Sequence, residues 1–276
     1  MSTPVLMGIV NASPESFSDG ASVGSLDEQV RRALALRDAG AAIVDVGGES
    51  GVTDRPPVSE GEETDRVVPL IDRLAGEGIE VSVDTWKPAV ARAALAAGAT
   101  MVNDVSGLRD PALAEACAES GAALVITHTA APPKEKRFPG YADVGEEVVA
   151  FLRERIELAR SHGVERIVLD PGPDLAKTPA ETVAALRALP AVVALGHPVL
   201  LAVSRKDFVG AITGRAPRDR LAGTLAAIGA GLDAGASILR VHDVAATADY
   251  LAVRAALRGE RGVEADVRLD PGLRRA

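Results

Sequence analysis

The chain has 276 residues, and 47% of them are hydrophobic but only 3% aromatic, so a large core must be built from Ala, Val, Leu and Ile. The net charge of −9 argues against non-specific binding to nucleic acid, and no apolar run reaches the length of about 18 residues that a membrane span requires. The single cysteine, Cys117, excludes an internal disulfide, and the start of the chain lacks the features of a secretory signal, so we expect a cytoplasmic protein.

Short apolar runs alternate along the chain with segments of helical periodicity. The runs are Val5–Val10, Ala42–Val46, Glu80–Val83, Met101–Val105, Ala123–Ile126, Arg166–Leu169, Val199–Val203 and Ile238–Val241. The helical segments include Leu26–Ala39, Glu60–Leu74, Ala89–Ala97, Gly145–Arg160 and Ala245–Leu257. This alternation predicts one (β/α)8 barrel over residues 1–257, with a doubly wound open sheet as the alternative. We expect residues 258–276, which are rich in charge and glycine, to be a mobile tail.

Nearly every apolar run is followed at once by a polar or ionisable residue. In a barrel these positions converge on the mouth at the C-terminal ends of the strands, where active sites lie. Capping of the following helix explains some of these residues, and we assign that role to Asp243. Capping cannot explain all the strand exits, so the sequence predicts that several of these side chains point together into the mouth.

The exits of the third, fourth and sixth runs carry Asp84, Asn103 and Asp170. Two carboxylates and an amide form a set of acceptors and donors that suits a heterocycle with an amino-pyrimidine edge. A metal site is the competing interpretation of the two carboxylates. We favour it less, because His128 and His242 lie on different exits without the spacing of metal ligands.

The exits of the seventh and eighth runs are cationic instead. They carry Ser204-Arg205-Lys206 and, after the last run, Arg240 and His242. Barrels often hold phosphate at these two exits, and arginine suits bidentate phosphate contacts. A ring that carries a phosphate or pyrophosphate is therefore the simplest ligand. Two long excursions, residues 12–24 and 51–58, are interpreted as lids over the mouth, with exposed loops of no function as the alternative.

Seven motifs in the chain resemble those of the dihydropteroate synthases. The motifs are Met7-Gly-Ile-Val-Asn-Ala-Ser-Pro-Glu-Ser-Phe-Ser-Asp-Gly20, Asp45-Val-Gly-Gly-Glu-Ser50, Ser82-Val-Asp-Thr85, Val102-Asn-Asp104, Leu169-Asp-Pro-Gly172, Ser204-Arg-Lys206 and Arg240-Val-His-Asp243. They occur in the order that the family has, over roughly residues 5 to 257. The resemblance implies a (β/α)8 barrel, usually a homodimer, and a target of sulfonamides. It also implies the joining of 6-hydroxymethyl-7,8-dihydropterin pyrophosphate to 4-aminobenzoate in folate synthesis, with release of pyrophosphate.

The same resemblance implies roles for individual residues on the pterin side. Asp84, Asn103, Asp170 and Lys206 match the positions that bind the pterin, and Asp84, Asp170 and Lys206 are the expected catalytic set. Asn11 matches the residue that ligates Mg²⁺ on the pyrophosphate. In the family the pyrophosphate leaves first, and the amine then attacks the resulting pterin cation.

The remaining implied contacts bind the anions. Arg240 and His242 match the pyrophosphate-binding pair, while Ser204 and Arg205 match the neighbours of the aminobenzoate carboxylate. The family's Ser-Thr-Arg-Pro-Gly stretch corresponds here to residues 50–57. Within it Thr53 and Arg55, which we count among the substrate-binding residues, align only across an insertion.

Two further stretches depart from the family pattern. The fifth exit continues into Ala130-Ala-Pro-Pro-Lys-Glu-Lys136, and Pro173-Asp174-Leu175 stands where the family usually has a hydrophobic residue, Gly and Phe. We expect the carboxylate of Asp174 to weaken binding of 4-aminobenzoate and its sulfonamide mimics, unless it faces solvent or caps the helix near Pro179. Two alternatives to a synthase stay open: a pterin-binding paralogue, of divergent actinobacterial type, without the activity or with another amine, and a pterin-dependent methyltransferase.

Overall fold

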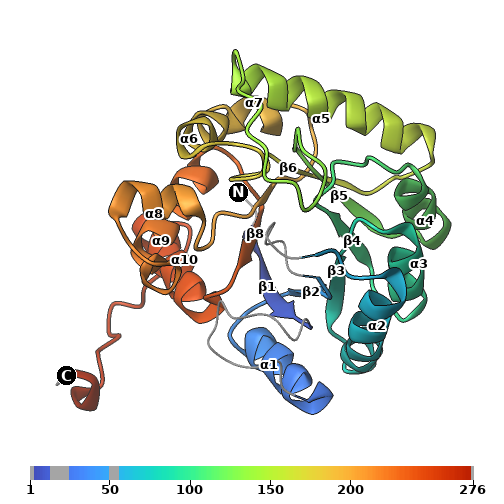
Figure 1. Ribbon diagram of the computed structural model, residues 1–276. Coiled ribbons are helices and arrows are strands. Elements are labelled where there is room, and N and C mark those ends of the chain that lie inside the picture. Colours follow the sequence, from blue (N-terminus) through green and yellow to red (C-terminus); the bar gives the residue numbers. More distant parts are fainter. Residues whose placement is uncertain (1–2, 13–24, 50–55, 275–276) are drawn as a thin grey trace.

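The eight apolar runs form parallel strands that curl into a barrel ringed by helices, as the view along its axis in Figure 1 shows. The computed structural model describes residues 3–12, 25–49 and 56–274, and every structural statement below concerns these residues. The strand order is β6-β5-β4-β3-β2-β1-β8-β7, and a parallel bridge between Leu169 and Val199 joins the two ends of this series. The predicted (β/α)8 barrel is confirmed, and the open sheet is excluded.

The strands follow the predicted apolar runs closely. They are β1 (Val5–Asn11), β2 (Ile43–Gly47), β3 (Glu80–Asp84), β4 (Met101–Asp104), β5 (Ala123–Thr127), β6 (Ile167–Asp170), β7 (Leu200–Leu201) and β8 (Ile238–Val241). The largest difference is β7, which we predicted to span Val199–Val203. Its hydrogen-bonded register with β8 covers only Leu200 and Leu201, because the backbone turns soon afterwards to place Arg205 at a φ of 58°.

The helices lie outside the strands. They are α1 (Leu26–Asp38), α2 (Glu60–Gly76), α3 (Pro88–Ala96), α4 (Ala112–Ser120), α5 (Val144–Ser161), α6 (Pro179–Arg187), α7 (Leu189–Val193), α8 (Asp207–Thr213), α9 (Leu221–Asp233) and α10 (Val244–Leu257). Their ends follow local signals in the sequence. At α6, for example, Thr178 accepts a hydrogen bond from the Glu181 amide, and the Glu181 carboxylate accepts one from the Thr178 amide.

The strands are buried on both faces, as parallel strands covered by helices should be. Along β2, Ile43 belongs to the cluster inside the barrel, whereas Val44 and Val46 belong to the layer between strands and helices. The interior cluster consists of Met7, Ile43, Met101, Ala123, Val125, Val168, Leu200, Ala202 and Ile238. These side chains fill the lower barrel, so the polar residues above them form the floor of the mouth.

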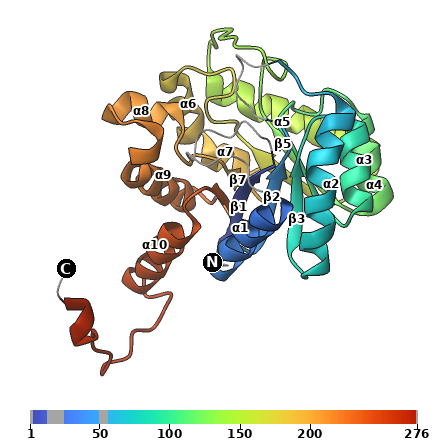
Figure 2. The same ribbon diagram turned by 60° about the horizontal axis from the view of Figure 1, so that its bottom comes forward.

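The chain beyond α10 leaves the barrel. Figures 1 and 2 both show it running away from the helices to a short 3-10 helix at Pro271–Arg274. Val263, Leu269 and Leu273 are exposed along this stretch. The predicted mobility of the tail stays a prediction. None of the helices formed by the described residues combines the length and apolar character needed to cross a membrane.

Candidate active site

The last residues of the first three strands and the penultimate residue of β4 lie side by side at the mouth. In the strand register Asn11 pairs with Gly47, Gly47 with Asp84, and Asp84 with Asn103. Gly47 has no side chain, and a Cβ built there would lie 3.6 Å from Asp84 Cβ and 3.8 Å from Asn11 Oδ1. Asn11 and Asp84 therefore face each other across a position that is open only because it is glycine.

The guanidinium of Arg240 occupies the centre of this row. Its Nε donates to Asp45 Oδ2 at 2.6 Å, and its Nη2 donates to Asp84 Oδ2 at 2.7 Å. Asn103 Nδ2 also donates to Asp45 Oδ2, at 3.1 Å. We expected Arg240 to stand with the cations of the anion-binding half, but here it lies among the carboxylates. Its role in binding pyrophosphate stays a prediction.

Asp45 belongs to the site, although the sequence analysis named it only as part of a motif and gave it no role. Its side chain is fully buried on β2, and its Oδ1 has no hydrogen-bond partner among the described residues. A charged residue inside the apolar run Ala42–Val46 is the signal that could have revealed it. Burying a carboxylate without a partner is very costly, so a buried Asp at this position predicts a polar or cationic partner nearby. Asp45 orients both Asn103 and Arg240 from below the mouth.

The carboxylates of the mouth hold their protons more tightly than free ones. Burial raises the pKa of Asp84 to about 7, while Arg240 opposes this rise and Asp45 adds to it. Burial also raises the pKa of Asp170, against a hydrogen bond from the Gly172 amide and the charge of Lys206. Burial alone would lower the pKa of Arg240, but Asp45 and Asp84 raise it, so this guanidinium stays charged.

Lys206 is the fourth residue that we predicted to bind the pterin, and that role stays a prediction. It is half-buried at the start of α8, and its charge acts on both Asp84 and Asp170. Among residues 3–12, 25–49 and 56–274, its ammonium has no hydrogen-bond or ion-pair partner. Within the described part of the chain, the Lys206 ammonium is therefore open to an incoming anion or acceptor.

A buried lysine lies behind Asp170 and was not predicted. Lys177 is 2% exposed, and its Nζ lies 2.7 Å from His128 Nδ1, 2.9 Å from the Gly172 carbonyl oxygen and 3.2 Å from that of Leu175. Burial lowers the pKa of Lys177 to about 7, and burial together with the charge of Lys177 lowers the pKa of His128 to about 3. Nothing in the spacing of the sequence marks this pair, because its members follow different strands.

The cationic exits of β7 and β8 form pairs of their own. Ser204 Oγ lies 3.0 Å from His242 Nδ1, and the His242 amide also donates to that oxygen. The guanidinium of Arg205 binds both carboxylate oxygens of Asp243, at 3.1 and 2.7 Å. The prediction that Asp243 caps the next helix is wrong for its side chain: the residue stands at the N-cap of α10, but its carboxylate binds Arg205.

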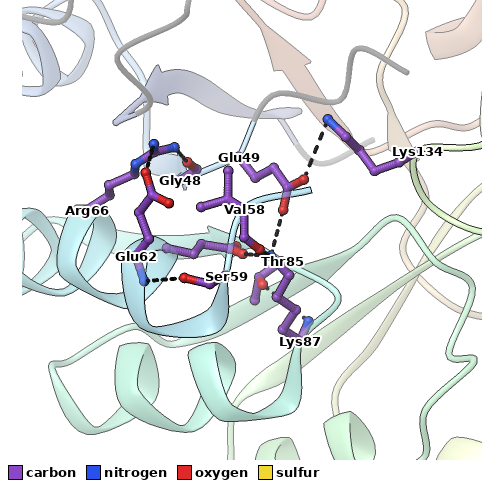
Figure 3. A network of polar contacts seen from close by, with 10 residues as sticks. Gly48, Glu49, Val58, Ser59, Glu62, Arg66, Thr85, Lys87 and Lys134 are labelled. Atoms are coloured by element: carbon purple, nitrogen blue, oxygen red, sulfur yellow. Dashed lines mark hydrogen bonds and ion pairs between the residues drawn. The ribbon is translucent and has the colours of Figure 1, made fainter. Parts of the chain in front are cut away.

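A network of buried charges flanks the mouth at the exit of β2. Lys87 Nζ lies 2.6 Å from a carboxylate oxygen of both Glu49 and Glu63, and Lys134 approaches Glu49 to 3.5 Å. Figure 3 shows Glu49 between Lys87 and Lys134, which come from the loops after β3 and β5. Through the ion pair of Lys134 with Glu49, the unusual segment at residues 130–136 is thus attached to the exit of β2. Thr53 and Arg55, which follow Glu49, lie outside the described residues.

Comparison with known proteins agrees with this geometry. Residues 7–242 match the model of the family described as pterin binding enzyme. The dihydropteroate synthase of Bacillus subtilis is 39% identical over 263 residues, which are 94% of this chain and 90% of that protein. The Xanthomonas albilineans dihydropteroate synthase solved with 4-aminobenzoic acid is 43% identical, with a TM-score of 0.86 over 93% of this chain and 94% of that one. A structure of the same synthase with 7,8-dihydropteroate gives 42% identity and a TM-score of 0.83, with 93% and 94% covered.

The chain therefore belongs to the pterin-binding enzyme family. Within that family its activity is that of a dihydropteroate synthase, a transferase of folate biosynthesis.

The raised pKa of Asp84 leads to a prediction about pH. We expect the affinity for a pterin to increase roughly tenfold as the pH rises through about 7, because the ionised carboxylate is the stronger acceptor for ring N–H groups. The measurement is the dissociation constant by calorimetry between about pH 5.5 and 8.5 in wild type and Asp84→Asn. If the variant kept the same pH dependence, another group would be responsible for it.

Proposed function

We propose that the barrel mouth joins 6-hydroxymethyl-7,8-dihydropterin pyrophosphate to 4-aminobenzoate, giving 7,8-dihydropteroate and pyrophosphate. The arrangement of Asp84, Asn103 and Arg240 around buried Asp45 carries the proposal, because it sets acceptors for a nitrogen-rich ring beside a fixed positive charge. The names and ligands of the similar synthases support it. We further propose that the protein acts in the cytoplasm, as a homodimer, and that sulfonamides compete with 4-aminobenzoate.

Each ring-facing group has a defined part in binding the pterin. Ionised Asp84 and Asp170 accept hydrogen bonds from ring nitrogens. Because the Asp45 carboxylate accepts, the amide nitrogen of Asn103 must face it, and this leaves the Asn103 carbonyl oxygen turned elsewhere as an acceptor. Lys206 donates, and it lies within the electrostatic reach of both carboxylates.

The chemical step exchanges one bond for another. The C–O bond to the pyrophosphate breaks, and both electrons leave with the oxygen. The carboxylates of Asp84 and Asp170 stabilise the electron-poor pterin cation, while Lys206, Arg240 and His242 stabilise the departing anion. The amine of 4-aminobenzoate then supplies its lone pair to form the C–N bond and loses a proton. Ser204 and Arg205 are proposed to bind the carboxylate of this second substrate.

Asn11 fits the Mg²⁺ that the family resemblance implies. Its amide oxygen is a hard donor at the rim of the mouth, and Mg²⁺ needs few protein ligands when phosphate oxygens and water supply the others. No group of three or more His, Cys, Asp or Glu among the described residues is arranged as a metal site of its own. When bound, Mg²⁺ neutralises charge on the leaving pyrophosphate.

The contacts of Asp174 remove the main reason for expecting a defective amine site. Its carboxylate oxygens accept from the backbone amides of Asp207 and Phe208, at 2.5 and 3.3 Å. The alternative that Asp174 caps the helix near Pro179 is wrong in its helix: the residue caps α8 and not α6. A carboxylate engaged by two amides is not the unpaired charge that the predicted repulsion of 4-aminobenzoate required.

The proposal is tested with the purified chain and its two substrates. We expect 7,8-dihydropteroate and pyrophosphate to appear in equal amounts, measured by chromatography and a pyrophosphate assay. The chain should also restore growth of a strain that lacks the synthase. Binding of the pterin pyrophosphate without any product would favour the pterin-binding paralogue, and a failure to bind it would overturn the proposal altogether.

Lys206 gives a prediction about pterin affinity. Hydrogen bonds to charged groups contribute roughly 1.5–3 kcal/mol each, so Lys206→Ala should weaken binding of the pterin pyrophosphate at least about tenfold. The measurement is calorimetry, with thermal unfolding as a check on the fold. Lys136→Ala, which removes an exposed lysine from the loop after β5, is the matched control and should bind as the wild type does. Unchanged affinity in Lys206→Ala would rule out the assigned role.

Asn11 gives a prediction about metal dependence. Asn11→Ala should raise the Mg²⁺ concentration needed for half-maximal rate and should slow cleavage of the C–O bond, because one oxygen ligand is lost. Asn11→Asp keeps an oxygen ligand and should retain activity. Binding of a pterin without phosphates should not change in either variant. If Asn11→Ala instead abolished that binding, Asn11 would be a ring contact and the proposed metal role would be wrong.

A further inference from the structure

The turn that follows Asp170 has an unusual backbone. Gly172, Asp174 and Ala176 all have positive φ angles, of 66°, 63° and 52°. Gly172 cannot be replaced here, because a Cβ would lie 2.0 Å from the carbonyl oxygen of His128. Asp174 and Ala176 carry side chains, and the left-handed conformation is unfavourable for L-residues, although less so for Asp, so contacts must hold them in it. The surroundings must hold the turn in this form.

Hydrogen bonds to the carbonyl groups of the turn hold its backbone in this conformation. Lys177 donates to the carbonyl oxygens of Gly172 and Leu175, and the Tyr141 hydroxyl donates to that of Ala176 at 3.1 Å. The carbonyl groups of the turn thus point towards buried donors. Asp170 lies at the start of the same turn, and its Oδ1 accepts from the Gly172 amide at 2.7 Å. The orientation of the Asp170 carboxylate therefore depends on the shape of the turn.

Asp174 connects this turn to a distant helix. Its carboxylate binds the first two amides of α8, as described above, and Thr182 Oγ1, which is fully buried, contacts both its amide (3.1 Å) and its Oδ1 (3.2 Å). The side chain of Lys206, the N-cap residue of α8, makes no capping hydrogen bond. The cap of α8 therefore comes from a residue 33 positions earlier in the chain.

The position of this contact links it to the pterin pocket. Asp207, whose amide binds Asp174, directly follows Lys206. On the other side the Arg205 amide donates to Thr224 Oγ1 at 3.1 Å, and Arg220 Nη1 donates to the Arg205 carbonyl oxygen at 2.8 Å. The backbone is thus held by hydrogen bonds on both sides of Lys206. The bonds on the C-terminal side come from Asp174, which belongs to the same turn as Asp170.

We propose that Asp174 is a positioning residue for Lys206. It fastens the turn that orients Asp170 to the first turn of α8, so that the carboxylate and the ammonium facing the pterin keep a fixed separation. Asp174 does not touch the substrate in this role. The inference rests on the proposed function of Lys206 as a ligand of the pterin pyrophosphate.

The test is a double-mutant cycle between Asp174 and Lys206. Asp174→Gly accepts the positive φ but removes the carboxylate, and we expect it to raise the dissociation constant of the pterin pyrophosphate about tenfold by calorimetry. In a Lys206→Ala background the same change should alter that constant less than about twofold, because the group that Asp174 positions is absent. Asp174→Asn keeps one acceptor oxygen. It should bind the pterin pyrophosphate more tightly than Asp174→Gly does, but only in the protein that retains Lys206.

The control separates positioning from general stability. Asp110 caps α4 through the Ala112 amide at 3.0 Å, so Asp110→Gly removes a comparable capping carboxylate without touching the turn or α8. It should lower the melting temperature and leave pterin affinity unchanged. An equal loss of affinity from Asp174→Gly with and without Lys206, or no loss at all, would overturn the inference. If Asp174→Gly does not fold, Asp174→Asn is used instead: its loss of pterin affinity should again be larger with Lys206 present than in the Lys206→Ala background. If the wild type bound no pterin pyrophosphate, the proposed function would fail together with the inference.

Discussion

The contact between Arg240 and two buried carboxylates is the constraint on which the site depends. Asp45 lies in the middle of β2 and Asp84 ends the neighbouring β3, and burying such charges costs several kcal/mol each unless a cation is held against them. Arg240 comes from β8 and meets Asp45 across 195 residues of sequence. The pairing of β8 with β1, the last strand with the first, brings them together. The barrel and this cluster of charges at its mouth are therefore assembled together.

The exits of the strands were predictable, because their pattern is local. Each apolar run ends within a few residues of a polar group, and parallel strands bring such ends to one face. Asp84, Asn103 and Asp170 accordingly stand where the sequence indicated. The directions of the long cationic side chains were not predictable. Arg240 has the carboxylates of Asp45, Asp84 and Asp170 around it, and the two that it binds are decided by distances that only the folded barrel defines. The pairing of Arg205 with Asp243 likewise depends on the folded positions of two different strand exits.

Asp174 shows a second limit of the local pattern. A carboxylate a few residues before a helix usually caps that helix, and Pro179 marked the start of one. The first turn of α6 is already capped by Thr178 and Glu181, however, so the Asp174 side chain is free to bind α8. The burial and contacts of Lys177 could not be predicted from the sequence either, since its partners belong to the loop after β5 and to its own turn. In both cases the missing information was the packing of one loop against another.

The charges around Glu49 have a consequence for how this protein can diverge. Glu49, Glu63, Lys87 and Lys134 form a nearly buried set with no net charge, drawn from the exits of β2, β3 and β5 and from α2. Replacing one member leaves an uncompensated buried charge, which is far more costly than replacing an oppositely charged pair. These loops are consequently not independent units of evolution. A loop after β5 transferred from a relative would be tolerated only if it brought a cation to Glu49, or if the exit of β2 changed with it.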